Sequence, residues 1–121
     1  MTPRELLDNV VAASEELKAL DPVVLDIQGK STMADYMFIC TGTSDVHVRS
    51  IVERIEKNLR EKGVRIDHVE GLPQATWVLM DYGTVIVNVM QAEQREYYGM
   101  EEFWEKMPLV EDIILAVREG T

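Results

Sequence analysis

The chain has 121 residues, 46% of them hydrophobic, and a formal net charge of −10, which predicts one soluble domain with its own hydrophobic core. The acidic balance argues against bare nucleic acid as the partner, because phosphate binding depends on Lys and Arg displacing counterions. The sequence has no apolar run near the roughly 20 residues of a membrane helix, no signal-peptide pattern and a single cysteine, Cys40, so we expect a cytoplasmic protein without membrane contact.

The hydrophobic periodicity predicts elements in the order α-β-β-α-β-β-β-α-α. Thr2 is expected to cap the first helix, and Thr43 or Ser44 the second. Gly99 is a candidate break in the third helix. The expected elements are helix 3–19, strand 23–27, strand 35–42, helix 45–62, strands 64–69, 75–81 and 84–90, and helices 93–106 and 111–120.

These elements, without repeats or a linker, predict a single α/β domain over residues 1–121 with a mixed five-stranded sheet flanked by helices. Tyr82 and Gly83 are expected to turn a hairpin between the last two strands. In strand 75–81, alternation places Trp77 and Asp81 on the same face of the sheet. Because a face that carries Asp81 should not be fully buried, we expect Trp77 to be partly exposed.

The sequence offers no coherent active site. His47 and His68 lack Cys or His neighbours at the spacing of metal ligands, so we expect no metal and no cofactor. Ser44 fails the nucleophile-elbow pattern, since Val46 stands where glycine is required. Residues 42–44 (Gly-Thr-Ser) could grip a phosphate at a helix start, but the paired Asp-x-Asp carboxylates that hold magnesium in nucleotidyltransferases are absent.

The second half of the chain is both acidic and aromatic. Between Asp67 and Asp112 there are ten acids and two bases, which account for −8 of the net charge. Both tryptophans and three of the four tyrosines lie between Glu70 and Trp104. Aromatic side chains give binding surfaces large rigid contact areas, and carboxylates around them select a basic partner. This block therefore predicts a surface that docks a basic protein, although Phe103 and Trp104 fit a core role equally well.

Several motifs in the chain resemble the ribosomal silencing factor family, also called Iojap-like proteins. The resemblance covers nearly the full length, and its most specific parts are the string from Trp77 to Gly83 and the Arg-x-Tyr-Tyr motif. The matching residues are Asp35-Tyr36, Thr41-Gly42-Thr43-Ser44, Glu70-Gly71, Ala75-x-Trp77-Val78-Leu79-x-Asp81-Tyr82-Gly83 and Arg95-x-Tyr97-Tyr98.

The resemblance implies a domain like a nucleotidyltransferase core that lacks the metal carboxylates and is not an enzyme. It also implies binding to the large ribosomal subunit through large-subunit ribosomal protein fourteen, which blocks joining of the small subunit and represses translation under nutrient limitation. Trp77, Tyr82 and Tyr98 are expected to supply apolar contact area, with acids around them. The residues expected to bind the partner are Glu70, Trp77, Asp81, Tyr82, Glu93, Arg95, Tyr97 and Tyr98.

One departure from the family pattern and two alternative functions are open at this stage. Asn88 stands where the family commonly has His, which puts any binding or pH-sensing role of that position in doubt. The first alternative is a nucleotide-binding or nucleotidyltransferase-like enzyme that uses the turn at residues 42–44. The second is a homodimer that pairs through the aromatic face, since isologous pairing is the commonest oligomeric mode.

Overall fold

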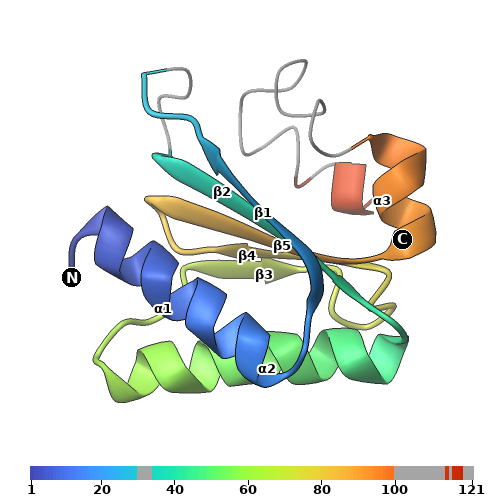
Figure 1. Cartoon of the computed structure of the whole chain (residues 1–121), viewed down its shortest axis with the longest axis horizontal. Coiled ribbons are helices and arrows are strands. Elements are labelled where there is room, and N and C mark those ends of the chain that lie inside the picture. The colour runs from blue at the N-terminus through green and yellow to red at the C-terminus, as the bar shows by residue number, and fades with distance from the viewer. Residues whose placement is uncertain (30–33, 100–113, 115, 119–121) are drawn as a thin grey trace.

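The structure, a computed structural model, describes residues 1–29, 34–99, 114 and 116–118. Its five-stranded sheet has the strand order β1-β2-β5-β4-β3 (Figure 1). The parallel pair β2 and β5 lies in the middle, and the other neighbours are antiparallel, which confirms the predicted mixed sheet. The elements are α1 (Pro3–Glu16), β1 (Leu20–Asp26), β2 (Tyr36–Gly42), α2 (Asp45–Glu61), β3 (His68–Glu70), β4 (Trp77–Asp81), β5 (Val85–Gln91) and α3 (Ala92–Tyr98).

Side chains at the helix starts explain where α1 and α2 begin. The hydroxyl of Thr2 accepts a hydrogen bond from the backbone N–H of Glu5, whose carboxylate in turn accepts from Thr2 N–H, so α1 starts with a capping box. Ser44 caps α2 by accepting from His47 N–H at 3.1 Å. Both caps confirm the sequence prediction.

Several boundaries differ from the prediction, and β1 begins at Leu20 rather than at residue 23. Helix α1 ends at Glu16 rather than residue 19, because Lys18 adopts a positive φ of 58° and the chain enters β1 directly. Strand β3 holds only three residues, His68–Glu70. Helix α3 ends at Tyr98, where Gly99 takes the left-handed conformation that commonly terminates helices. The expected continuation to residue 106, with Phe103 and Trp104, lies outside the described residues, as does most of helix 111–120.

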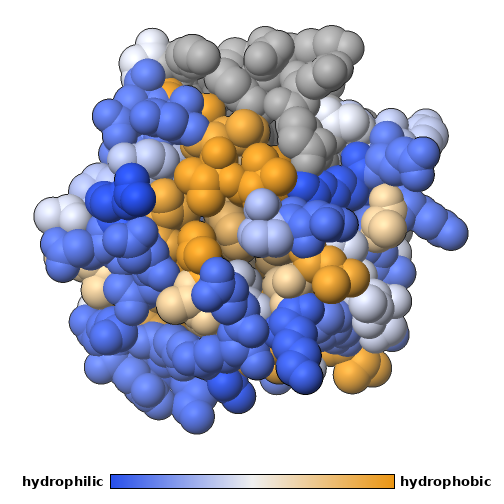
Figure 2. All heavy atoms as spheres, in the orientation of Figure 1, coloured by the Kyte–Doolittle hydropathy of each residue, from blue (hydrophilic) through white to orange (hydrophobic). Residues whose placement is uncertain are grey.

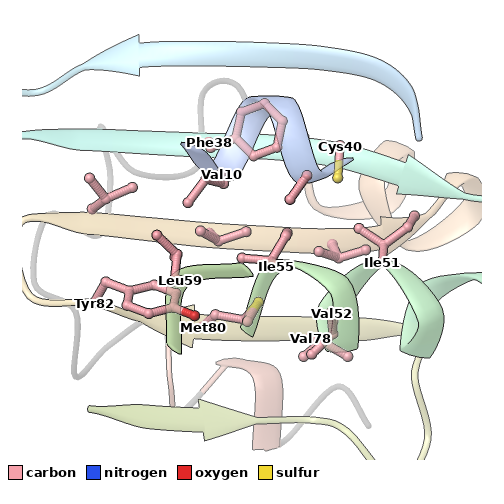
Figure 3. Close-up of a cluster of buried hydrophobic side chains, with 14 of the residues drawn as sticks. Val10, Phe38, Cys40, Ile51, Val52, Ile55, Leu59, Val78, Met80 and Tyr82 are labelled. Atoms are coloured by element: carbon pink, nitrogen blue, oxygen red, sulfur yellow. The ribbon is translucent and has the colours of Figure 1, made fainter. Parts of the chain in front are cut away.

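One face of the sheet packs against α1 and α2 (Figure 1). Alternate residues of the strands, such as Phe38 and Cys40 of β2 and Val78 and Met80 of β4, point toward the layer of the two helices, and Phe38 lies beside Val10 of α1 (Figure 3). Burial raises the pKa of the Cys40 thiol to about 12. This face forms the larger apolar core.

The opposite face of the sheet carries a second apolar cluster. Trp77, Leu79 and Met90 are buried there, and Tyr98 of α3 packs against them. Val117 is also buried in this cluster, and Ile114 is half-buried beside it. Strand β2 is therefore covered on both faces, which fits its nearly continuous apolar sequence.

The outer strand β1 leaves some apolar surface exposed. Figure 2 shows apolar side chains gathered near the centre of the face that carries this strand, with hydrophilic side chains around them. Val24 of β1 is 45% exposed. This apolar area belongs to the edge of the sheet.

Gly71 provides a test of how tightly the loop before β4 is packed. A Cβ atom at Gly71 would lie 2.1 Å from the carbonyl oxygen of Trp77, whereas one at Gly63 would meet nothing within 4 Å, and φ is positive at both residues. Gly63→Ala should therefore cost about 1 kcal/mol of unfolding free energy, and Gly71→Ala about 2 kcal/mol more. Chemical denaturation of the two variants measures the difference, and equal costs would contradict this packing.

Candidate protein-docking surface

The sheet topology separates the predicted binding residues into two groups. Strand β4 runs antiparallel to β5, so that Trp77 lies opposite Met90 and Asp81 opposite Ile86. Helix α3 follows directly after β5, which places it next to the start of β4. We call this region the α3 end; it comprises α3, the loop of residues 71–76 and the first turn of α2. Glu70, Trp77, Glu93, Arg95, Tyr97 and Tyr98 lie at or next to the α3 end, whereas Asp81 and Tyr82 lie at the opposite end of the sheet.

Trp77 is a core residue, and the expectation that it is partly exposed is wrong. Its side chain is only 1% exposed. The indole N–H donates a hydrogen bond to Asn88 Oδ1 at 2.8 Å, and the ring centroid lies 4.8 Å from that of Tyr98. The predicted alternation of β4 is correct, but the face that Trp77 shares with Asp81 is covered by α3 and by Val117.

Asn88 now has a structural role. It is fully buried in the middle of β5 and accepts the indole hydrogen bond from the neighbouring strand. A buried polar atom is costly without a partner, so Asn88 Oδ1 and the indole N–H of Trp77 satisfy one another. At the position where the family commonly has His, this chain therefore carries a group that fixes the core and faces no solvent.

Asp81 and Tyr82 belong to the hairpin at the far end of the sheet. The carboxylate of Asp81 accepts a hydrogen bond from Gly83 N–H at 2.7 Å, which closes the turn. Tyr82 is buried against α2, and this burial raises its pKa. The expectation that Tyr82 offers an apolar anchor is contradicted by its burial, because the turn directs its ring into the core.

Arg95 fastens α3 to the sheet. Its guanidinium donates to the carbonyl oxygen of Asp21 at 2.6 Å and to the hydroxyl of Thr41 at 3.0 Å. These atoms belong to β1 and β2, so one side chain connects α3 with both strands. Arg95 thereby sets the position of the helix that carries the exposed tyrosine.

Tyr97 is the most exposed large apolar residue at the α3 end, with 80% of its surface accessible. Its ring meets that of Tyr98 edge to face, with a centroid separation of 5.0 Å. Tyr98 in turn contacts Trp77, with the two rings tilted by 49°, so two further aromatic rings lie beneath the exposed one. Glu93 and Glu96 are exposed on the same short helix, which surrounds the aromatic group with negative charge.

Glu70 lies at the end of β3 and is held by two side chains. Its carboxylate is 2.9 Å from Arg118 Nε and 3.5 Å from His68 Nε2. The hydrogen bond from Arg118 lowers the pKa of Glu70 below its ordinary value. Glu70 thus joins β3 to the C-terminal segment and contributes an acid at the border of the α3 end.

Sequence reasoning missed the apolar residues of two other elements at this end. Val46, on the first turn of α2, is 67% exposed, and Leu72, in the loop before β4, is 37% exposed. Val46 lies outside the buried residues of α2, and the Gly-Leu-Pro sequence at residues 71–73 is typical of a turn and does not indicate a contact surface.

The start of α2 is occupied by the protein's own groups, which argues against the nucleotide-binding alternative. The N–H of Thr43 donates to His47 Nδ1 at 2.9 Å, and that of Val46 donates to the carboxylate of Asp45 at 2.9 Å. Asp45 also places a negative charge where a phosphate would bind. Among the described residues, no group of three or more His, Cys, Asp and Glu side chains is arranged to hold a metal ion.

A family model described as "Ribosomal silencing factor during starvation" matches residues 1–120. The chain belongs to this family. The family's name describes a regulatory factor rather than an enzyme, and the match confirms the resemblance found in the sequence motifs.

Similar proteins and a similar solved structure support the assignment. The ribosomal silencing factor RsfS of Halalkalibacterium halodurans is 40% identical over 111 residues, which are 92% of this chain and 95% of that protein. A crystal structure of a Chromobacterium violaceum protein is similar with a TM-score of 0.84 and 32% identity, covering 87% of this chain and 88% of that one. The mouse protein named "Mitochondrial assembly of ribosomal large subunit protein 1" is 26% identical over 132 residues, covering 95% of this chain and 57% of that protein.

The helices in the described part of this family member do not reach the length and apolar character that crossing a bilayer requires.

The buried indole hydrogen bond predicts the effect of Trp77→Phe. Without the N–H, Asn88 Oδ1 loses its donor in a buried site, which should lower the unfolding free energy by about 1–3 kcal/mol. Adding Asn88→Leu removes the orphaned polar group and should recover part of that loss. Denaturant unfolding of both variants tests this, and a double variant no more stable than Trp77→Phe would contradict the assignment.

The lowered pKa of Glu70 predicts a pH-dependent stability. A carboxylate whose pKa is lower in the folded state stabilises the fold above its ordinary pKa of 4.5, and this contribution is lost as the pH falls. Wild type should exceed Glu70→Gln in unfolding free energy at pH 7, and the gap should close below about pH 4. In an Arg118→Gln background the gap should be small at every pH; a gap of unchanged size there would exclude Arg118 as the cause.

Proposed function

We propose that this protein binds the large ribosomal subunit and blocks joining of the small subunit, thereby repressing translation when nutrients are limited. Family membership supports a ribosomal role, and the mouse relative is named for assembly of the large subunit. The observation that carries the proposal is the α3 end itself, where Tyr97 is exposed and contacts the buried aromatic pair of Tyr98 and Trp77, with acids beside it.

The chemistry of the α3 end fits a basic protein partner. Ribosomal RNA would be repelled by Glu93 and Glu96, whereas Lys and Arg side chains of a protein would be attracted to them. We propose large-subunit ribosomal protein fourteen as that partner, because the sequence motifs resemble a family that binds it. Docking at a face that the small subunit also needs would prevent joining by steric exclusion alone, without catalysis.

The structure redistributes the roles that we propose for the predicted binding residues. Tyr97 supplies apolar contact area, and Tyr98 supports it while remaining half-buried. Glu93 and Glu70 contribute to the acidic surroundings. Trp77 and Arg95 act from beneath the surface by holding α3, while Asp81 and Tyr82, at the far end of the sheet, take no part in this contact.

A subunit-joining assay tests the proposed function directly. Purified large and small subunits, mixed at a magnesium concentration that favours joining, are separated on a sucrose gradient with and without the protein. We expect the protein to sediment with the large subunit and to shift the balance toward free subunits. Unchanged joining, with no protein in the large-subunit fraction, would overturn the proposal.

Tyr97→Ala tests the role of the exposed ring. Truncating an aromatic anchor commonly costs about 2 kcal/mol of binding free energy, or about 30-fold in affinity. Val24→Ala is the matched control, since it removes exposed apolar surface from β1 rather than from the α3 end. If the affinity for the large subunit falls equally in both variants, or falls in neither, Tyr97 is excluded as an anchor.

Light scattering at two protein concentrations shows whether the protein forms a homodimer that buries the same surface.

A further inference from the structure

One arginine connects α2 to the loop that precedes β4. The guanidinium of Arg49 donates from Nη2 to the carbonyl oxygen of Pro73 at 2.5 Å and from Nε to that of Leu72 at 3.3 Å. Its Nη1 also donates to the carboxylate of Asp45 at 3.2 Å, which fixes the guanidinium plane. Three donors of a single side chain thus bind three acceptors on two elements.

The loop that Arg49 contacts has an uncommon backbone conformation. Gly71 has φ of +85° and Ala75 has φ of +57°, although Ala75 carries a Cβ and is fully buried. The N–H of Ala75 donates to the carbonyl oxygen of Gly71 at 3.0 Å, which closes the loop on itself. Non-glycine residues in the left-handed region persist only where surrounding contacts impose them, and they cluster at functional sites.

The closed loop projects its middle residues into solvent. Leu72, Pro73 and Gln74 are all exposed, between two ends that are fixed in the structure. The carbonyl oxygen of Thr76 accepts from Gln91 N–H, and that of Ala75 accepts from the Gln91 side chain. The base of the loop is therefore attached to the residue that immediately precedes α3.

We infer that Arg49 is a positioning residue that presets residues 71–75, so that exposed Leu72 and nearby Val46 form a second apolar part of the docking surface. This inference rests on the proposed function, because its partner is the same basic protein of the large subunit. The carboxylate of Asp45 neutralises the charge of Arg49. The hydrogen bonds from Arg49 to the loop, which we call the clamp, therefore add no net positive charge to a surface that selects a basic partner. A loop fixed before binding loses less conformational entropy on docking than a mobile one.

The contacts of Arg49 identify the loop, rather than the core, as their target. They end on carbonyl oxygens of exposed residues, and interactions of exposed charged groups contribute little to global stability. Loss of the clamp should therefore loosen residues 71–75 without unfolding the protein. The global stability of the protein and the order of residues 71–75 can therefore be measured separately.

Arg49→Lys is the test, with Arg54→Lys as its matched control. Lysine keeps the charge but lacks the planar fork that reaches two carbonyl oxygens. Arg54 lies on the same helix and instead pairs with Glu16 at 2.8 Å, away from the loop. Three measurements are made on wild type and both variants: thermal midpoint, amide hydrogen exchange at Ala75, and affinity for purified large subunits.

We expect Arg49→Lys to leave the thermal midpoint within about 3 °C of wild type, to speed exchange at Ala75, and to weaken subunit binding about 5- to 10-fold. Arg54→Lys should change neither exchange at Ala75 nor binding. Faster exchange with unchanged binding would show that the loop lies outside the docking surface and would overturn the inference, as would unchanged exchange. If wild type itself does not bind large subunits, the proposed function fails, and the docking role of the loop fails with it.

Discussion

The buried hydrogen bond from Trp77 to Asn88 is the constraint on which the α3 end depends. It ties β4 to β5 in the cluster that lies between the sheet and α3. Tyr98 packs on the indole ring, and the backbone at Gly71 approaches the Trp77 carbonyl too closely for any side chain. The helix on one side and the loop on the other therefore both pack against the same tryptophan.

The direction of β4 explains why neighbours in the sequence have different roles. Trp77 and Asp81 are the first and last residues of one strand, and β4 runs away from α3. Acidic residues that are close together in the sequence therefore lie at two different ends of the molecule. The negative charge near the exposed tyrosine comes instead from α3 itself and from the end of β3.

Local patterns were sufficient to predict most of the fold. Alternation in β4, the caps at Thr2 and Ser44, and the break at Gly99 are properties of short segments, and the structure confirms each of them. The burial of Trp77 was not predictable in this way, because the residues that cover it, Tyr98 and Val117, are 21 or more positions further along the chain. A carboxylate on a strand face was interpreted as a sign of exposure, but Asp81 satisfies itself in the hairpin turn.

The sequence predicted the chemistry of the candidate site, but it predicted only some of the residues that form it. Composition identified an acidic, aromatic region, and Tyr97 meets that expectation. Exposure of Leu72 depends on a loop conformation that is fixed by Arg49, a residue 23 positions earlier in another element. Nothing in the residue types of either segment indicates that contact. Long-range hydrogen bonds of this kind become visible only when the chain is folded.

The buried thiol of Cys40 has a practical consequence for studying this protein. Alkylating reagents attack the thiolate, and a thiol with a pKa of about 12 inside the core stays protonated at neutral pH. Cys40 is the chain's only cysteine. Maleimide dyes and photo-crosslinkers can therefore be attached at a single cysteine introduced on the surface, with the native residue left in place. Fluorescence and crosslinking can then locate the partner without disturbing the larger core.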